Sequence, residues 1–507
     1  MPGINEDRER QVVPRWRDYK ATRSRGELAP LRSPGSNQFS DEMLDNLLKD
    51  WQSNPSISVA SDLVSCALTL GRFTTAIDAA HSVLSNNRAP RAARGLASTY
   101  LSETEGTPLD VVLTPGMRTV LGKPPTFGIQ SHLYGQVRET RAQLERYPRN
   151  PILWCNLARL YTSLGLQEKA TRSMKAALSM APNNRFILRA GSRLHLHQGD
   201  KELAHRLLVN SASLKADPWI LAGEIATAAA NHKISNHIKF ARKLLEDGRY
   251  PPFHVSELAS ALGTLELIAG NVKLGRKLVR TSLEHPTENA IAQAAWITRN
   301  VGISPMDWGM KTASYEANYW LAWKASDWAT AIGETQTWQN DEPFSSRPAI
   351  HVSYLASVIF EDFSLAIDSA RQGLRSNQRD VTLFNNLAFS LAQVGQVAEA
   401  KKVLNRAKLL DATQAEKIFL TATEGLIAFR NYQPDLGRSL YEKAISRAKT
   451  AGDSGEHVAR LYLAREELLH HSPQAEDFRR EALDSARSLT DPVHRAIVNR
   501  VRQFQAP

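Results

Sequence analysis

A recurring 34-residue spacing of small and aromatic residues is the feature that most restricts how this 507-residue chain can fold. The best example is NPILWCNLARLYTSLGLQEKATRSMKAALSMAPNN, near residues 151–184. Apolar residues recur at helical spacing before and after Gly165, which lies between the two runs. Glycine tolerates the left-handed backbone that ends many helices, and Pro182 ends the second run. This segment therefore predicts two antiparallel helices joined by a short turn.

The same spacing returns along most of the chain. Further units keep some of the small or aromatic positions, and they lie near 57–90, 185–218, 256–289, 312–345, 346–380, 381–414 and 418–451. In the best unit, the pattern W-x2-L-A-x2-Y-x3-G-x4-A-x3-M-x2-A-x4-P starts at Trp154 and ends at Pro182, and it resembles a tetratricopeptide repeat. The resemblance covers about 57–451 with gaps. It implies an all-α, superhelical array of antiparallel helix pairs, roughly nine to eleven in number.

Departures from the pattern divide the chain into six expected parts. They are a basic N-terminal arm, helical repeats with a loop insertion near 105–130, basic repeats, aromatic-rich irregular repeats, further repeats, and a final helix pair with a capping helix. These parts span 1–38, 39–150, 151–290, 291–345, 346–451 and 452–507. The last helix, near 491–504, carries Val493, Ile497 and Val501 on one face, which suits a cap over the exposed core of the final repeat.

Composition narrows the class of protein. The two cysteines, Cys66 and Cys155, lie in apolar helical patterns, so we expect them to be buried and reduced. The N-terminus has no apolar signal region, and no run reaches the ~18 apolar residues that span a bilayer. We therefore expect a cytoplasmic protein without membrane contacts. Residues 151–280 hold 19 Lys and Arg against 9 Asp and Glu, so most of the net charge of +11 lies there.

The basic repeats carry the main candidate binding site. In the family that the sequence resembles, the first helix of each pair lines a concave groove. Arg159 and Arg193 occupy the same first-helix position in successive repeats, and Arg189 lies one turn before Arg193. With the neighbouring Asn156, these arginines predict a groove that pairs with carboxylate or phosphate, although a solvated face without a ligand is the alternative. Further cations lie on the second helices, and we expect them on the outer surface: Lys169, Arg172, Lys175, Arg206, Lys239, Arg242 and Lys243.

Two other groups of residues are candidates for contacts. The arm contains Arg15, Trp16, Arg17, Tyr19 and Lys20, a mixture that can grip nucleic acid, dock on the repeats or remain without fixed structure.

Six of the ten tryptophans lie between 296 and 338. Tyr315, Tyr319 and Trp323 share one helical face, which favours a core seam. Trp320 lies off that face, so we predict an exposed anchor for a partner.

Catalytic and cofactor motifs are not recognisable. The segment from Gly116 to Lys123 has five residues between its glycines and Pro124 where a phosphate-binding loop has Ser or Thr. The pair His195 and His197 points to different sides of a helix, so a zinc site is not predicted. We therefore predict a protein that is not an enzyme and has no cofactor or metal.

The favoured hypothesis is a protein–protein interaction scaffold whose basic groove binds an acidic peptide or helix of a partner protein. The first alternative is a nucleic-acid-associated protein that uses the basic repeats and the arm on phosphates. The second is a ligand-sensing regulatory subunit of an enzyme encoded elsewhere. The sequence names neither the partner nor the oligomeric state, because folds of this kind serve unrelated processes.

Overall fold

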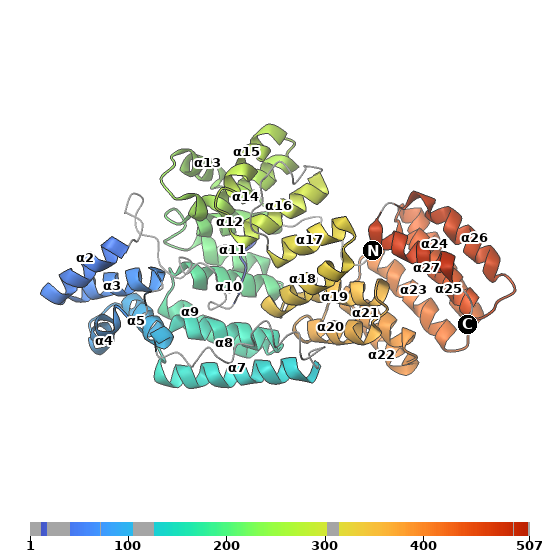
Figure 1. Cartoon of the computed structure of the whole chain (residues 1–507), viewed down its shortest axis with the longest axis horizontal. Helices are drawn as coiled ribbons and strands as arrows, with labels where there is room; N and C mark the ends of the chain where they lie inside the picture. The colour runs from blue at the N-terminus through green and yellow to red at the C-terminus, as the bar shows by residue number, and fades with distance from the viewer. Residues whose placement is uncertain are drawn as a thin grey trace. The chain divides into compact units, whose positions relative to one another are not determined.

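A computed structural model describes residues 12–17, 41–70, 72, 74–104, 126–301, 314–489 and 491–504, and none of these residues lies in a β-strand. Over these ranges the chain forms twenty-five α-helices and one short 3-10 helix (Figure 1). They divide into two compact units. The N-terminal unit contains the described residues from 12 to 301, and the C-terminal unit contains those from 314 to 504. The division falls inside the predicted aromatic-rich stretch, 291–345.

The N-terminal unit consists of helices that follow one another in antiparallel pairs. Its helices are α2 (Asp41–Ser53), α3 (Ile57–Leu70), α4 (Ile77–Ser85), α5 (Arg91–Thr104), α7 (Thr126–Arg146), α8 (Pro151–Ser163), α9 (Gln167–Met180), α10 (Arg185–His197), α11 (Lys201–Val209), α12 (Pro218–Ala230), α13 (Ile238–Glu246), α14 (Pro252–Ile268), α15 (Val272–Ser282) and α16 (Glu288–Val301). Helix α7 begins at the end of the predicted insertion, and residues 105–125 of that insertion lie outside the described residues.

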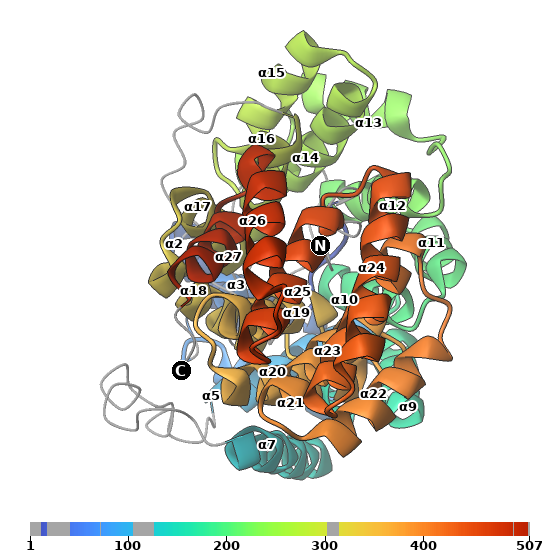
Figure 2. The ribbon, with the colours of Figure 1, turned by 90° about the vertical axis from the view of Figure 1, so that its right-hand side faces the viewer.

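The C-terminal unit is built in the same way. Its helices are α17 (Tyr315–Ala325), α18 (Trp328–Asp341), α19 (Ser346–Val358), α20 (Phe363–Ser376), α21 (Val381–Gln393), α22 (Val397–Lys408), α23 (Gln414–Arg430), α24 (Pro434–Ala451), α25 (Gly455–Leu469), α26 (Ala475–Ser485) and α27 (Pro492–Gln503). Figure 2 shows α23 to α27 packed side by side. The predicted all-α array of helix pairs is confirmed in both units.

Local sequence explains where these helices begin and end. Asn150 and Asn184, 34 residues apart, are the N-caps of α8 and α10, and their side chains accept hydrogen bonds from the backbone N–H groups of Ile152 and Ile187. Gly165 and Gly199, also 34 residues apart, follow the same two helices with φ of 72° and 84°. A side chain at either glycine would strain this left-handed turn, so the repeat spacing fixes the turns as well as the helices.

The first and second helices of a pair differ in burial. Ten of the 13 residues of α8 and 11 of the 13 residues of α12 are buried, against four of 14 in α9 and two of nine in α13. In the C-terminal unit, 11 of 13 residues of α21 and three of 12 in α22 are buried. First helices are therefore covered on more than one side. We call their side away from the second helices the inner face, and the exposed side of the second helices the outer face.

The structure also places the two cysteines and the last helix. Cys66 and Cys155 are buried, as predicted, and are not joined in a disulfide. Helix α27 packs on α25 and α26 through a buried stripe. That stripe contains the predicted Val493, Ile497 and Val501, together with His494.

Candidate partner-binding sites

The predicted arginines lie on the inner face of the N-terminal unit, on neighbouring first helices. Arg159 on α8 is 5% exposed, and its Nε donates a hydrogen bond of 3.3 Å to Oδ1 of Asn156. Arg189 on α10 is also 5% exposed, whereas Arg193, one turn further, is half-buried. The repeat spacing therefore placed Arg159 and Arg193 on successive first helices. Their predicted role in binding a partner stays a prediction.

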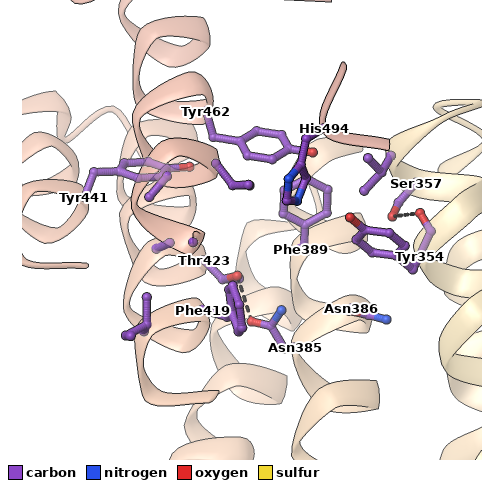
Figure 3. Close-up of a pocket in the computed structure, with 16 residues that line it drawn as sticks. Tyr354, Ser357, Asn385, Asn386, Phe389, Phe419, Thr423, Tyr441, Tyr462 and His494 are labelled. Carbon is purple, nitrogen blue, oxygen red and sulfur yellow. Dashed lines mark hydrogen bonds between the residues drawn. The ribbon is translucent and has the colours of Figure 1, made fainter. Parts of the chain in front are cut away.

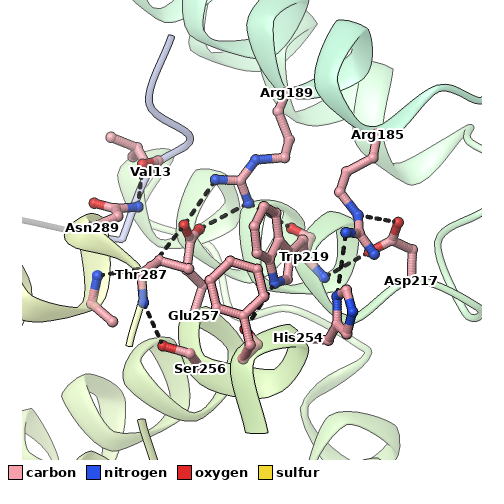
Figure 4. Close-up of polar contacts among 12 residues, drawn as sticks. Val13, Arg185, Arg189, Asp217, Trp219, His254, Ser256, Glu257, Thr287 and Asn289 are labelled. Carbon is pink, nitrogen blue, oxygen red and sulfur yellow. Dashed lines mark hydrogen bonds and ion pairs between the residues drawn. The ribbon is translucent and has the colours of Figure 1, made fainter. Parts of the chain in front are cut away.

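Arg189 pairs with a carboxylate of the protein itself. Its Nη1 lies 2.8 Å from Oε2 of Glu257 on α14, and its Nη2 donates a hydrogen bond of 2.9 Å to Oε1. Oε1 also accepts from the Thr287 hydroxyl at 3.2 Å (Figure 4). Both members of this ion pair are almost fully buried. The charge of Arg189 is thus balanced within the protein, and its guanidinium holds α10 against α14.

A second buried ion pair lies one turn away. Nε of Arg185, which is 1% exposed, lies 2.6 Å from Oδ2 of Asp217. The guanidinium carbons of Arg185 and Arg189 lie 4.7 Å and 4.9 Å from the ring centroid of Trp219, so the indole lies against both cations. Nδ1 of His254 lies 3.4 Å from Nη1 of Arg185, and burial together with this cation lowers the pKa of His254 to about 4. Sequence reasoning missed Arg185, although it precedes Arg189 by one helical turn.

Residues 12–17 of the arm lie against the helices of the N-terminal unit. Val12 is 1% exposed and joins a core cluster with residues of α10 and α12, and Trp16 is fully buried. Pro14 contacts α12 where Gly223 leaves space, since an added Cβ on Gly223 would lie 3.2 Å from the proline ring. This segment is therefore anchored by apolar side chains rather than by charge alone.

Polar contacts join the same segment to α16. The Val13 carbonyl accepts a hydrogen bond of 2.9 Å from Nδ2 of Asn289 (Figure 4). The Arg17 guanidinium forms an ion pair with Glu288. Of the alternatives that the sequence left open for the arm, docking on the repeats applies to residues 12–17. The arm residues Tyr19 and Lys20 lie outside the described residues.

The inner side of the C-terminal unit contains a pocket that sequence reasoning did not predict (Figure 3). First helices α19, α21, α23 and α25 supply most of its wall, and the capping helix α27 adds His494. The wall is formed mainly by apolar and aromatic side chains, including Phe389, Phe419 and Tyr462. The rings of Phe389 and Tyr462 meet edge to face, with centroids 5.4 Å apart. No single repeat contains these residues, so the repeat pattern alone gives no signal for the pocket.

One polar side chain of this pocket, His494, is unsatisfied. It is 2% exposed, and neither of its ring nitrogens has a hydrogen-bond partner among the residues that the structure describes. Burial lowers the pKa of His494, which favours the neutral imidazole with one donor and one acceptor. Burial also raises the pKa of Tyr462 to about 12, so its hydroxyl stays protonated. An unsatisfied buried polar group costs stability, and its presence therefore calls for an explanation.

The predicted exposure of Trp320 is wrong. Its side chain is 5% exposed, and its ring lies 4.5 Å from that of Tyr319 and 5.1 Å from that of His351, measured between centroids. The helical stripe of Tyr319 and Trp323 explained one buried face of α17, but α19 covers the adjacent side as well. First helices are buried on several sides, so a residue off the main stripe is not thereby exposed.

The cations of the second helices lie on the outer face of the N-terminal unit, as predicted. All of them are exposed: Lys169, Arg172, Lys175, Arg206, Lys239, Arg242 and Lys243. Helix α15 adds four more exposed cations, Lys273, Arg276, Lys277 and Arg280, and has no acidic residue. A continuous set of cations on α15 forms a surface that attracts anionic partners.

In the described part of the chain, no group of three or more His, Cys, Asp or Glu side chains is arranged to hold a metal ion. Within the same residues, each helix is too short or too polar to cross a bilayer.

Comparisons with known proteins agree with the repeat pattern. Residues 152–184 match the family model described as tetratricopeptide repeat. No curated protein sequence matches the chain significantly. Similar solved structures include the APC/C hetero-tetramer Cut9–Hcn1, with 12% identity, 90% of this chain and 92% of that chain covered, and a TM-score of 0.40. Yeast Tom70 has 15% identity, with 74% and 93% covered, and a TM-score of 0.28.

Proposed function

Because this chain is a tetratricopeptide-repeat protein, and such proteins generally act as protein-interaction scaffolds, we propose that the inner face of its N-terminal unit binds a segment of a partner protein. The observation that carries this proposal is the position of residues 12–17. They form no helix, they lie on this face, and they bury Val12 and Trp16 there. A face that accepts a non-helical segment of its own chain has the shape to accept one from a partner.

The chemistry of the proposed partner segment follows from the arginines. Arg159 and Arg193 lie 34 residues apart on neighbouring first helices, near Asn156. A guanidinium pairs with a carboxylate through two parallel hydrogen bonds, which adds geometric specificity to charge. We therefore propose an acidic segment beside Arg159 and Arg193. Glu257 already balances Arg189, so this residue positions α10 rather than binding the partner.

An affinity purification with quantitative mass spectrometry tests this proposal. The full chain, the double variant Arg159→Glu/Arg193→Glu and the matched outer-face variant Lys169→Glu/Lys175→Glu are compared, with circular dichroism to confirm folding. We expect the inner-face variant to lose partners that the outer-face variant keeps. Because Arg159 is buried, the milder pair Arg159→Gln/Arg193→Gln repeats the test without a charge reversal. A partner set that is the same for all these variants contradicts the proposal.

A second function, binding of nucleic acid, is favoured by the outer face. Its exposed cations include four on α15 without an acidic neighbour on that helix. The buried Trp16 is unavailable for base stacking while residues 12–17 are docked, so phosphate contacts on the outer face would carry the binding. Affinity for a nonspecific DNA duplex, measured across salt concentrations, should fall steeply on a log–log plot. Lys273→Ala/Lys277→Ala should reduce that slope by about two. Absence of binding at low salt rules this function out.

A further inference from the structure

The pocket of the C-terminal unit is a second binding site, separate from the inner face of the N-terminal unit. We propose that it takes one apolar side chain of a non-helical peptide segment from a partner protein, and that His494 and Asn385 hydrogen-bond to the peptide backbone beside that side chain. No residue of this pocket belongs to the N-terminal unit, so the proposal does not depend on the function proposed above.

The imidazole of His494 has two buried nitrogens that a ligand could satisfy. It is 2% exposed and projects among Tyr354, Phe389 and Tyr462 in the pocket (Figure 3). A neutral imidazole has one N–H donor and one nitrogen acceptor, and neither has a partner in the described part of the chain. A peptide backbone offers a C=O and an N–H within a few ångströms of each other. A peptide backbone therefore matches both needs at once.

Asn385 supplies a second polar group. Its Oδ1 accepts a hydrogen bond of 2.8 Å from the Thr423 hydroxyl, which fixes the orientation of the amide. This bond leaves the Nδ2 group as a donor on the pocket wall. The neighbouring Asn386 differs, because its Nδ2 is directed to Oγ of Ser353 at 2.9 Å and to the Ile350 carbonyl at 3.4 Å. Asn385 is thus the asparagine of this pair that can reach a ligand carbonyl.

The charge of the wall argues for an uncharged group in the pocket. None of the described residues that line it is Asp, Glu, Lys or Arg. Three nearby cations are paired: Arg430 with Glu466, and both Arg465 and Arg500 with Glu361. Arg500 also donates to the carbonyls of Val358 and Ile359 at 2.7 and 2.8 Å. Asp491 and Asp453 act on His494 from nearby, but neither lines the pocket. A charged side chain would lose its hydration here, and the described wall offers no group of opposite charge to replace it.

The wall itself selects an apolar or aromatic side chain. Phe389, Phe419 and Val458 contribute carbon surface from three different first helices. Ala422 is half-buried in the wall and is small, so it leaves space that a larger residue would fill. Burial of one apolar side chain in such a site is worth about 1.5–3 kcal/mol before the costs of association, enough for a specific anchor in a longer segment.

The test uses the full chain and a phage-displayed library of random short peptides. Peptides enriched on the wild type are synthesised with a fluorescent label, and their affinities are measured by fluorescence anisotropy. We expect a shared apolar residue among the enriched peptides. Ala422→Trp, which fills the pocket, and His494→Leu, which removes both hydrogen-bonding nitrogens, should each weaken binding about tenfold or more.

Two further variants separate binding from structure. His494→Gln keeps a donor and an acceptor, so it should restore part of the affinity that His494→Leu loses. His285→Leu, at an exposed position of the N-terminal unit, should leave the affinity unchanged. Arg159→Glu/Arg193→Glu should also have no effect, so failure of the N-terminal site and failure of this pocket give different results.

A measurement on the wild type covers the case in which the pocket variants do not fold. A photoreactive benzophenone replaces the shared apolar residue of an enriched peptide, and cross-linked segments are mapped by mass spectrometry. Cross-links to α21, α23 or α25 support the proposal. Cross-links confined to other helices, or a library that shows no enrichment on the wild type, overturn it. Equal binding by folded Ala422→Trp also overturns it.

Discussion

The inner face of the N-terminal unit and the pocket of the C-terminal unit are both built by the first helices of their pairs. They differ in whether their buried polar groups have partners within the chain. In the N-terminal unit, Arg185 and Arg189 are matched by Asp217 and Glu257, and residues 12–17 cover part of the face. In the C-terminal unit, both ring nitrogens of His494 lack a hydrogen-bond partner among the described residues. The buried charges of one inner side are thus paired within the chain, whereas the buried imidazole of the other side is left for a ligand to satisfy.

The largest effect is expected from Glu257→Ala. This change leaves the Arg189 guanidinium buried without its carboxylate, which should lower the stability of the N-terminal unit by about 3–5 kcal/mol. Hydrogen exchange with mass spectrometry can follow peptides from α10, α12 and α14 separately from the C-terminal unit.

The matched control is Glu399→Ala, because the Arg371–Glu399 pair is 45% exposed on both sides and should cost less than about 1 kcal/mol. Equal effects of the two variants would show that the buried pair does not stabilise the N-terminal unit as we infer.

Trp16→Ala should release the docked segment. Removal of a fully buried tryptophan side chain lowers the packing free energy by about 3 kcal/mol or more. The measured destabilisation cannot exceed the free energy with which residues 12–17 dock on the helices. Trypsin cleaves after Arg15 and Arg17, so limited proteolysis reports directly on docking. We expect these bonds to be cut faster in the variant than in the wild type. Asn289→Ala, which removes the hydrogen bond to Val13, should give a smaller change in the same direction. Unchanged cleavage would mean that Trp16 does not anchor the segment.

His494→Leu should stabilise the C-terminal unit while weakening peptide binding. The substitution removes buried polar atoms without partners, each of which costs about 1–3 kcal/mol. The expected readout is a higher Tm or urea midpoint. His351→Leu is a matched control in the same unit, since the Nδ1 of His351 lies 2.9 Å from the Tyr319 hydroxyl. His351→Leu removes this hydrogen bond to Tyr319 and should destabilise the protein. A loss of stability in His494→Leu would indicate a structural role for this imidazole.

The smallest effect at any one pH near neutrality concerns the buried His254 of the N-terminal unit. Burial and Arg185 hold the pKa of His254 at about 4, below its ordinary value of 6.5. Between these values the unfolded chain binds more protons than the folded one, so stability of the N-terminal unit falls as the pH drops from about 6.5 towards 4. The slope from this group is at most about 1.4 kcal/mol per pH unit. His254→Gln should flatten this part of the pH profile, measured by urea denaturation. An unchanged profile would contradict the assignment.

Local features of the fold were predictable because they depend on residues close in the chain. The turns at Gly165 and Gly199 and the buried stripe of α27 follow from helical periodicity and backbone freedom. The exposure of the second-helix cations follows from the same periodicity. Sequence spacing also placed Arg159 and Arg193 on neighbouring first helices.

The contacts that define the two sites were not predictable in this way. Glu257 reaches Arg189 across 68 residues, and Asn289 reaches Val13 across 276. Such pairs depend on how many helix pairs are stacked and at what angle, which no single repeat encodes. Trp320 shows the same limit, because α19 buries the side of α17 that its own periodicity left open.

The docked segment also has a consequence for biosynthesis. Val13 leaves the ribosome early, but its partner Asn289 follows 276 residues later. At about 5–20 residues per second, this interval is roughly 15–60 s. During that time the contacts of Val13 and Arg17 with α16 cannot form. Residues 12–17 therefore complete their native contacts only after α16 has been made.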